Sequence, residues 1–347
     1  MSAASPLSLD FMPPEALARQ SAAWWGTVLG VGVFGAGRAA GIPDGVPRVN
    51  VGTPRLDAAG AVCEVWRAAA PLRAGATGRL SYRCNEQVMF GCLELDEAEA
   101  AFAGAGSALQ RISHEAYRTL FALADEAGYP GLARVWNYFP AINAETHGSE
   151  RYWQFNAGRQ DAFRASGRGA EGNVPAACAL GAANGPLSLY FLALREAPRA
   201  IENPRQVCAY HYPAQYGPRS PTFARASLAA ASGSPLLFVS GTASIVGHRT
   251  LHAGDARAQT EETLRNIEAV LAEARRAVPA CTLGLPELAY KVYVRNAADF
   301  AAVEASVRAQ VGAHAPAVFL HADVCRADLL VEIEACGGGA VALEIGR

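Results

Sequence analysis

The chain has 347 residues, 51% of them apolar and 18% charged, which is the composition of a globular protein with material for about two domains. A net charge of −2 gives no support for a nucleic acid or an anionic membrane surface as a partner. The eight cysteines show neither CxxC nor zinc spacing, so we expect free thiols, no metal site and a reducing, cytoplasmic location. Acidic residues precede the first apolar run, at 22–37, so we expect no signal peptide, and that run is too short to span a bilayer.

Residues 30–35 read Gly-Val-Gly-Val-Phe-Gly and fit the G-x-G-x-x-G pattern of dinucleotide-binding folds. That chemistry needs a helix directly after the glycines, because the helix N-terminus holds the pyrophosphate. Residues 35–47 are rich in Gly and Pro and cannot sustain a helix. We therefore predict a buried, Gly-rich strand followed by a turn, and no bound cofactor.

After residue 80 the sequence predicts a first unit of strands and helices. Apolar residues recur at helical spacing from Tyr117 to Ala124, with Ser113 as the expected N-cap and Gly128 at the expected C-cap. The predicted elements are a strand at 87–93, a helix at 113–127, a strand at 133–139, a helix at 150–163, an apolar segment at 175–181 and a strand at 187–193.

A second unit repeats this order. The predicted elements are a strand at 236–242, a helix at 260–278, a strand at 289–295, a helix at 299–310, an apolar segment at 316–320 and a strand at 329–335. In both units the dipeptide Pro-Ala precedes the last strands. We predict two α+β domains, 1–200 and 201–347, each a mostly antiparallel sheet with helices on one face. The boundary is expected near 198–204, and residues 1–80 are expected to form an N-terminal extension.

Four strings in the second unit resemble the RidA/YjgF family: Phe238-Val-Ser-Gly-Thr, residues 258–267, Lys291-Val-Tyr-Val-Arg with Asp299-Phe300, and Leu330-Val-Glu-Ile-Glu-Ala. The resemblance implies a chorismate-mutase-like α+β unit with ligand clefts between adjacent units, and it places the family's carboxylate at Glu332. The family's arginine after Pro-Ala is replaced by Val318 and Phe319, which disfavours imine deamination.

The first unit narrows the choice. Residues 134–143, residues 150–159 and Phe163 resemble the chorismatase family, whose members are tandem RidA-like enzymes acting on chorismate. The resemblance covers roughly residues 80–347. It implies an enzyme that needs no cofactor, takes chorismate as its small-molecule partner, and works as a monomer or a small homo-oligomer.

Chorismate is a dianion with an enolpyruvyl ether, so its cleavage needs carboxylate recognition and a proton donor. Arginine binds carboxylates bidentately, and Arg151 and Arg159 lie about two helical turns apart on one expected face. Arg219 lies in the Pro- and Gly-punctuated segment that links the two units. Further candidates for substrate binding are Tyr210, Tyr212, Tyr216, Gly241, Thr242 and Lys291.

Glu332 is the predicted proton donor. Strand alternation places Glu332 and Glu334 on one face, and a carboxyl group in an apolar cleft stays protonated near neutral pH. The resemblance favours Glu332 over Glu334. The corresponding strand of the first unit, 187–193, carries no carboxylate, so only the second unit is equipped for this chemistry.

Cys325 is the predicted determinant of the product, because a cysteine here resembles the family members that form 3-hydroxybenzoate. Its bulk would exclude an attacking water and leave the substrate's 4-hydroxyl to displace the leaving group. We expect 3-hydroxybenzoate and pyruvate, with 4-hydroxybenzoate left open as a co-product. The alternatives are hydrolysis to a dihydroxycyclohexadienoate, RidA-like imine deamination, and a ligand-binding protein without catalysis.

Overall fold

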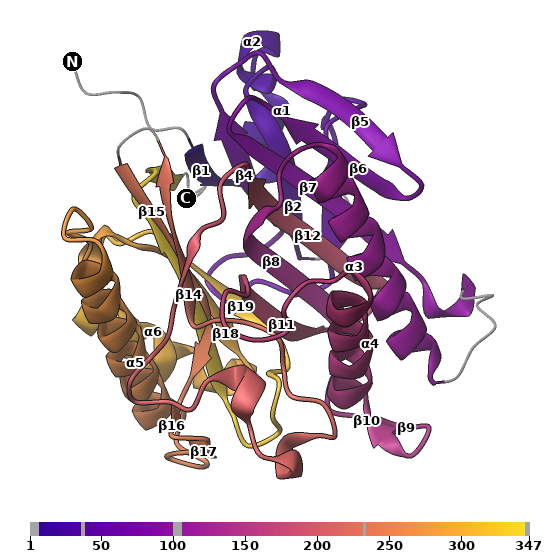
Figure 1. The fold of residues 1–347 in the computed structure, drawn as a ribbon. Coiled ribbons are helices and arrows are strands. Elements are labelled where there is room, and N and C mark those ends of the chain that lie inside the picture. Colours follow the sequence, from indigo (N-terminus) through magenta and orange to yellow (C-terminus); the bar gives the residue numbers. More distant parts are fainter. Residues whose placement is uncertain (1–6, 36–38, 100–105, 232–233, 344–347) are drawn as a thin grey trace.

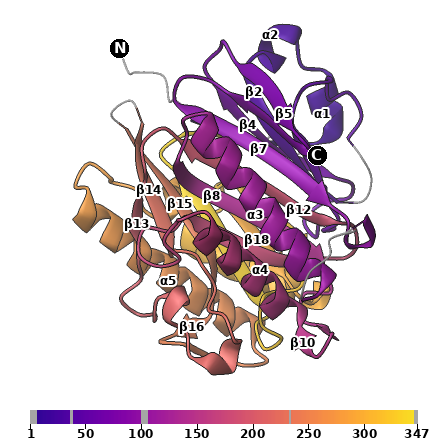
Figure 2. The ribbon, with the colours of Figure 1, turned by 45° about the vertical axis from the view of Figure 1, so that its right-hand side comes forward.

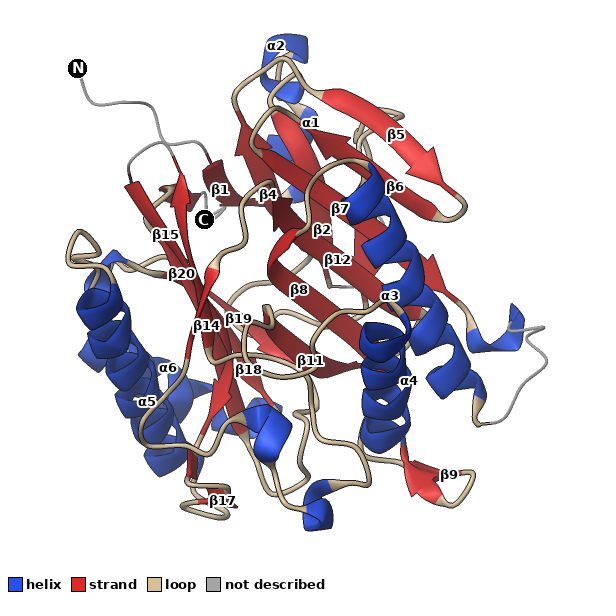
Figure 3. Cartoon of the chain, viewed as in Figure 1, coloured by secondary structure: helices blue, strands red, loops and turns tan. Residues whose placement is uncertain are grey.

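The computed structural model describes residues 7–35, 39–99, 106–231 and 234–343. Three large sheets meet at their inner faces, and the long helices lie on the outside (Figures 1 and 3). No helix in these described ranges is long and apolar enough to cross a membrane.

The N-terminal residues form a five-stranded sheet with the order β21-β1-β4-β2-β3. Its edge strand β21 comes from the C-terminal end of the sequence and pairs in parallel with β1. Two short helices, α1 (Pro14–Ala18) and α2 (Ala22–Trp25), pack beside it. The strands are β1 (Leu7–Met12), β2 (Val28–Phe34), β3 (Arg48–Val51), β4 (Val62–Ala68) and β21 (Ala340–Leu343).

The buried Gly-rich strand predicted at residues 30–35 is confirmed, because β2 is buried along its whole length. A Cβ atom at Gly30 would collide with the ring of Phe90, so glycine lets the neighbouring sheet approach closely. Residues 36–38, where the predicted turn begins, lie outside the described residues.

The first unit is a six-stranded sheet with the order β11-β8-β12-β7-β6-β5, in which β11 and β8 are parallel and the other pairs antiparallel. Its two long helices cover one face (Figure 2). The elements are β5 (Arg73–Thr77), β6 (Leu80–Cys84), β7 (Val88–Leu95), α3 (Ala108–Glu126), β8 (Gly131–Pro140), α4 (Arg151–Ala165), β11 (Ala176–Ala182) and β12 (Leu187–Leu194), with η1 (Glu97–Glu99) and a small hairpin of β9 (Glu145–Thr146) and β10 (Ser149–Glu150) between them.

The second unit has the order β13-β14-β15-β20-β18-β19, again with one parallel pair, β18 and β19. Its elements are β13 (Arg199–Ile201), β14 (Ala226–Ala231), β15 (Ser234–Ala243), α5 (Ala256–Ala277), β18 (Ala289–Val294), α6 (Phe300–Val311), β19 (Ala317–His321) and β20 (Val331–Gly337), with the small hairpin β16 (Ile245–Val246) and β17 (Arg249–Thr250) and the 3₁₀ turns η2 (Ala209–His211), η3 (Ala214–Tyr216), η4 (Leu285–Glu287) and η5 (Ala297–Asp299). The prediction of two tandem α+β units with mostly antiparallel sheets and helices on one face is confirmed.

The predicted N-cap of the first long helix was wrong. Ser107 caps α3, because its Oγ accepts a hydrogen bond from Gln110 N at 3.2 Å. Ser113 lies inside the helix and donates to Leu109 O at 2.7 Å. The buried stripe of α3 extends back through Leu109, so the earlier serine is the one at the true end of the helix. Gly128 directly follows the C-cap residue with a φ of 79°, a conformation that favours glycine.

The inner faces of the three sheets share one aromatic core. Trp66 of the N-terminal sheet contacts Trp136 of the first unit and Phe238 of the second, with ring centroids 5.8 Å and 6.1 Å apart. Tyr138 and Tyr293, one from each unit, hydrogen-bond through their hydroxyl groups at 2.7 Å. Such large buried rings contribute much of the core's stability, and they fix the two units against each other.

Candidate active site

A cavity of about 330 Å³ lies between the two units. A volume of this size suits a small organic ligand. Its walls come from residues 143–153 around the start of α4, residues 212–225 of the linking segment, and residues 241–245 and 325–332 of the second unit. The exposed side chains of Glu145 and Asp328 line its solvent side.

Glu332 lies at the buried end of this cavity. Strand alternation places it and Glu334 on the inner face of β20, where they are 3% and 4% exposed. The neighbouring strand β15 has a register irregularity between Val239 and Thr242. A Cβ atom at Gly241, within that irregularity, would collide with the carboxyl oxygen of Glu332. The missing side chain therefore makes room for the carboxyl group.

The environment of Glu332 favours the protonated acid. Burial, together with the negative charge of Glu334, raises the pKa of Glu332 to about 8. Arg134, the Cys325 thiol and Arg295 act in the opposite direction with smaller effect. Within the described residues, no cation forms an ion pair with Glu332. At neutral pH it is a carboxylic acid that faces the cavity and can donate a proton.

Cys325 lines the cavity beside Glu332. Burial raises the pKa of its thiol to about 12, and the nearby Glu332 adds to the shift. The thiol is therefore neutral, and its place in the wall gives it a steric effect on whatever the cavity holds.

Five of the predicted site residues line the cavity: Glu332, Cys325, Gly241, Tyr212 and Tyr216. The structure thus brings together the end of β20, the loop before it, the irregular part of β15 and the linking segment. The predicted residues that do not line it are Arg151, Arg159, Tyr210, Arg219, Thr242 and Lys291.

The arginines predicted from helical spacing have other partners. Arg151 binds Glu97 through two nitrogens, at 3.0 and 2.5 Å. Arg159 is fully buried and donates to Asn156 Oδ1 at 2.7 Å. Arg219 is partly exposed and lies 3.5 Å from Asp161. None of these three guanidinium groups faces the cavity.

The other three residues outside the cavity are also held elsewhere. Thr242 donates to Ser240 O at 2.8 Å, and Tyr210 packs against the core of the first unit. Lys291, predicted to bind substrate, is instead held by two buried glutamates. It is 4% exposed in the middle of the molecule, with its Nζ at 2.7 Å from Glu64 and 2.8 Å from Glu334.

Two arginines that sequence reasoning missed, Arg225 and Arg326, do line the cavity. Arg225 donates to Tyr212 Oη and to a backbone oxygen, both at 2.8 Å. The Arg326 guanidinium lies 3.8 Å from the ring centroid of Tyr216. Neither forms an ion pair with a carboxylate of the described chain, and Arg225 Nε and Arg326 Nη2 have no hydrogen-bond partner there.

Weak signals for both arginines are present in the sequence. Arg326 directly follows Cys325, and Arg225 is the only charged residue in the string Pro221–Leu228. A charged residue flanked by apolar neighbours is either buried with a partner or turned toward a site.

Comparison with known proteins identifies related families and enzymes. Residues 64–193 match the family model "Chorismatase FkbO/Hyg5-like, N-terminal", and residues 222–337 match "Endoribonuclease L-PSP". A chorismatase of Streptomyces hygroscopicus is 37% identical over 314 residues, which cover 89% of this chain and 88% of that protein. A 3-hydroxybenzoate synthase of the same organism is 44% identical over 228 residues, covering 63% and 67%.

A solved structure agrees with these sequence similarities. The crystal structure of a chorismatase is similar with a TM-score of 0.85 and 34% identity, covering 97% of this chain and 100% of that one. The match extends over both α+β units, so the tandem RidA-like architecture and the cavity between the units lie within the region compared. This chain is an enzyme that belongs to the chorismatase family.

Proposed function

We propose that the protein converts chorismate into 3-hydroxybenzoate and pyruvate, with Glu332 as the general acid. The observation that carries the proposal is a buried carboxyl group with a raised pKa, without a cationic partner in the described chain, at a cavity between two RidA-like units. The relative named 3-hydroxybenzoate synthase supports the choice of product.

The two carboxylates of the substrate would be held by Arg225 and Arg326. Guanidinium groups bind carboxylates with paired hydrogen bonds, and these two arginines line the cavity without an ion-pair partner in the described chain. Tyr212 contacts both arginines and Tyr216 contacts Arg326, and these rings would fix the guanidinium planes. Arg151, Arg159 and Arg219, which do not line the cavity, would support its walls.

The reaction begins when Glu332 transfers its proton to the terminal methylene carbon of the enolpyruvyl group. The positive charge that forms on the ether carbon weakens the bond between the ether oxygen and the ring. The substrate's own 4-hydroxyl oxygen attacks the ring carbon C3 that bears the ether, so the bonding electrons leave with pyruvate and the oxygen bridges C3 and C4 as an epoxide. The bond from this oxygen to C4 then breaks, which leaves the oxygen on C3. Loss of ring and hydroxyl protons on aromatisation returns a proton to Glu332, so the two products together contain the atoms of chorismate and no water is consumed.

Cys325 would decide between this route and hydrolysis. Its side chain lies in the wall next to Glu332, where a water would otherwise approach the reacting carbon. In Cys325→Ala, we expect the diene diol, heavier than 3-hydroxybenzoate by one water, to increase at the expense of the aromatic product. In heavy-oxygen water, the label should enter the diene diol.

The test is product analysis by mass spectrometry after incubating chorismate with the purified protein, without added metal or cofactor. We expect equal amounts of pyruvate and 3-hydroxybenzoate, and at least about 100-fold slower formation of both with Glu332→Gln. Pyruvate with the diene diol as sole second product would identify a hydrolase instead. Intact chorismate after incubation with the wild-type protein would overturn the proposal.

A further inference from the structure

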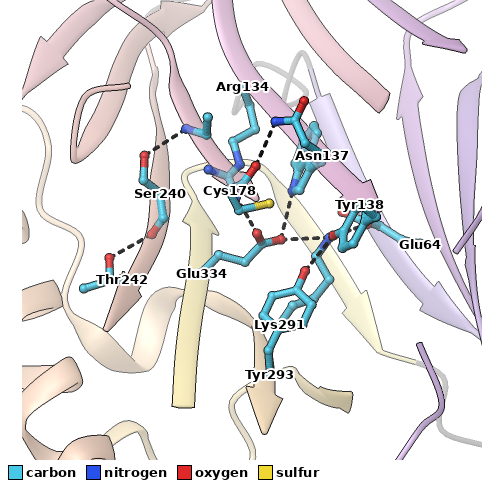
Figure 4. A network of polar contacts seen from close by, with 12 residues as sticks. Glu64, Arg134, Asn137, Tyr138, Cys178, Ser240, Thr242, Lys291, Tyr293 and Glu334 are labelled. Carbon is cyan, nitrogen blue, oxygen red and sulfur yellow. Dashed lines mark hydrogen bonds and ion pairs between the residues drawn. The ribbon is translucent and has the colours of Figure 1, made fainter. Parts of the chain in front are cut away.

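The two carboxyl groups on the inner face of β20 have opposite surroundings. Glu334 forms ion pairs with Arg134 and with Lys291 Nζ, the latter at 2.8 Å, and accepts a hydrogen bond from Trp136 Nε1 at 2.8 Å (Figure 4). Glu332, two residues earlier on the same face, has no ion pair in the described chain. One buried glutamate is thus held by two cations, and its neighbour by none.

The cations that hold Glu334 belong to a network that reaches all three sheets. Lys291 also binds Glu64 of the N-terminal sheet at 2.7 Å and Tyr190 of the first unit at 2.9 Å. Glu64 is 1% exposed and accepts hydrogen bonds from Tyr190 and Trp66 at 2.7 and 3.1 Å. Two acids and two cations are buried together, so the network is neutral as a whole, while its parts lie at different distances from Glu332.

A buried network of this kind is a weak source of stability, because removing the charges from water costs about as much as their attraction returns. Its position is more informative. The ionised end at Glu334 lies next to the proposed acid, and Glu64 lies beyond Lys291 on the far side. The field at Glu332 therefore comes mainly from the nearer carboxylate and its partner Arg134.

We propose that Glu334 is a positioning residue whose fixed negative charge, held by Arg134 and Lys291, keeps Glu332 protonated for proton transfer. This inference rests on the proposed role of Glu332 as general acid. Two like charges on one strand face cannot both form easily in a buried site. The cations decide which of the two carboxyl groups ionises.

The pKa directions agree with this geometry. Burial alone would raise the pKa of Glu334, but Lys291 and Arg134 outweigh it and the pKa is lowered. For Glu332, burial raises the pKa first and the charge of Glu334 second. Side chains two residues apart on a strand are about 7 Å apart, and at an effective dielectric constant of about 20 one charge at that distance shifts a pKa by about one to two units.

Other groups also face Glu332 from the elements packed around it. The pKa values of the neighbouring tyrosines and thiols are raised, chiefly by burial, so these groups stay neutral between pH 5 and 9. The neutral groups are Tyr152 of α4, Cys178 of β11, Tyr293 of β18 and Cys325. The charged groups are Glu334, Arg134, Arg295 after β18, and the cavity residues Arg225 and Arg326. Burial raises the pKa of Glu150, which also lines the cavity.

The test is the pH dependence of kcat for chorismate cleavage in single variants of the full chain. In the wild type, kcat should fall as the pH rises through about 8, because Glu332 then loses its proton. Glu334→Gln should move this alkaline limb to lower pH by about one to two units. Glu64→Gln, the same change in the same network but farther from Glu332, is the matched control and should move the limb by less than half a unit.

Arg134→Gln gives an independent readout if Glu334→Gln does not fold. It removes a positive charge and should move the limb to higher pH, opposite in sign to the effect of Glu334→Gln. An unshifted limb in the folded variants, or equal shifts in the Glu334 and Glu64 variants, would overturn the inference. If chorismate is not cleaved by the wild type, or if Glu332→Gln remains active, it is the proposed function that fails instead.

Discussion

The strands β12 and β20 hold the same place in their units but carry different side chains. Each pairs antiparallel with a neighbour on both sides. Ser188 of β12 lies opposite Tyr138, and Glu332 of β20 lies opposite Tyr293, while those two tyrosines hydrogen-bond to each other. Two copies of one fold thus meet almost symmetrically, and the carboxyl groups are confined to one of them.

The surroundings of the two strands explain why the difference is useful. Ser188 faces the N-terminal sheet, where its hydroxyl donates to Asn50 O at 3.4 Å. Glu332 faces the cavity between the units. The first unit contributes walls and a partner for the network, since Tyr190 of β12 binds both Glu64 and Lys291. The two copies of the fold therefore differ in that β20 carries carboxyl groups and β12 carries none, as the proposed chemistry requires.

The largest expected effect comes from replacing the matching side chains of β20 and β12 in turn. Glu332→Gln should lower kcat by about 10²–10⁴-fold, because a general acid contributes that much to the rate. Ser188→Ala, at the matching position of β12, should leave kcat within about twofold. Steady-state kinetics with chorismate measures both. Equal losses in the two variants would show that the two copies are not functionally distinct.

The room that Gly241 leaves for the acid can be tested next. Gly241→Ala places a Cβ atom where the Glu332 carboxyl group now lies. The carboxyl group must move, and we expect kcat to fall about 10²-fold, since small misplacements of a reacting group cost that much. A thermal melt close to that of the wild type would show that the fold persists. Unchanged kcat would mean that the position of the carboxyl group is not critical.

A third test asks whether chorismate binds to an arginine that lines the cavity or to one chosen from the sequence pattern. Replacing Arg326 by Gln should raise KM for chorismate by about 10- to 100-fold, because a hydrogen bond to a charged group is worth about 1.5–3 kcal/mol. Arg219→Gln is the matched control, since Arg219 lies beside Asp161 outside the cavity. Initial rates over a range of chorismate concentrations give both values. A larger effect at Arg219 would place the carboxylate site at Arg219 instead of at Arg326.

The buried acid should also appear in the stability of the free protein. The pKa of Glu332 is raised to about 8 when folded, above the value of about 4.3 in an unfolded chain. Its stabilising contribution is therefore complete below the unfolded pKa and is lost as the pH rises through about 8. Urea unfolding should show Glu332→Gln gaining a few kcal/mol relative to the wild type between pH 5 and pH 9, because the amide does not ionise. A constant difference would contradict a raised pKa.

Much of the fold follows from local pattern. The strands and helices predicted for the two units occur in the right order, because apolar periodicity and Pro-Ala breaks are short-range signals, but the strands β5, β6, β13 and β14, toward one edge of each sheet, were missed. Helix starts are less certain, since neighbouring polar residues compete to be the cap, and α5 begins at Ala256, four residues before the predicted start. The pairing of β21 with β1 gives no local signal.

The site divides in the same way. Glu332, Cys325 and Gly241 meet at the cavity because they come from strands and loops whose pairing is set within the second unit. Lys291 could not be placed from sequence, since its partner Glu64 lies 227 residues away and in another sheet. Helical spacing alone did not show which way Arg151 turns, because Glu97 outside the helix decides it.

The parallel pairing of β1 with β21 has a consequence for synthesis on the ribosome. Residues 13–339 separate the two strands, so β1 emerges early and waits for its neighbour until almost all of the chain described here has been made. Until then one edge of β1 has unpaired backbone groups that can join to other chains. The nascent protein is therefore expected to carry this open edge, with its risk of aggregation, until the last strands of the described chain have been made.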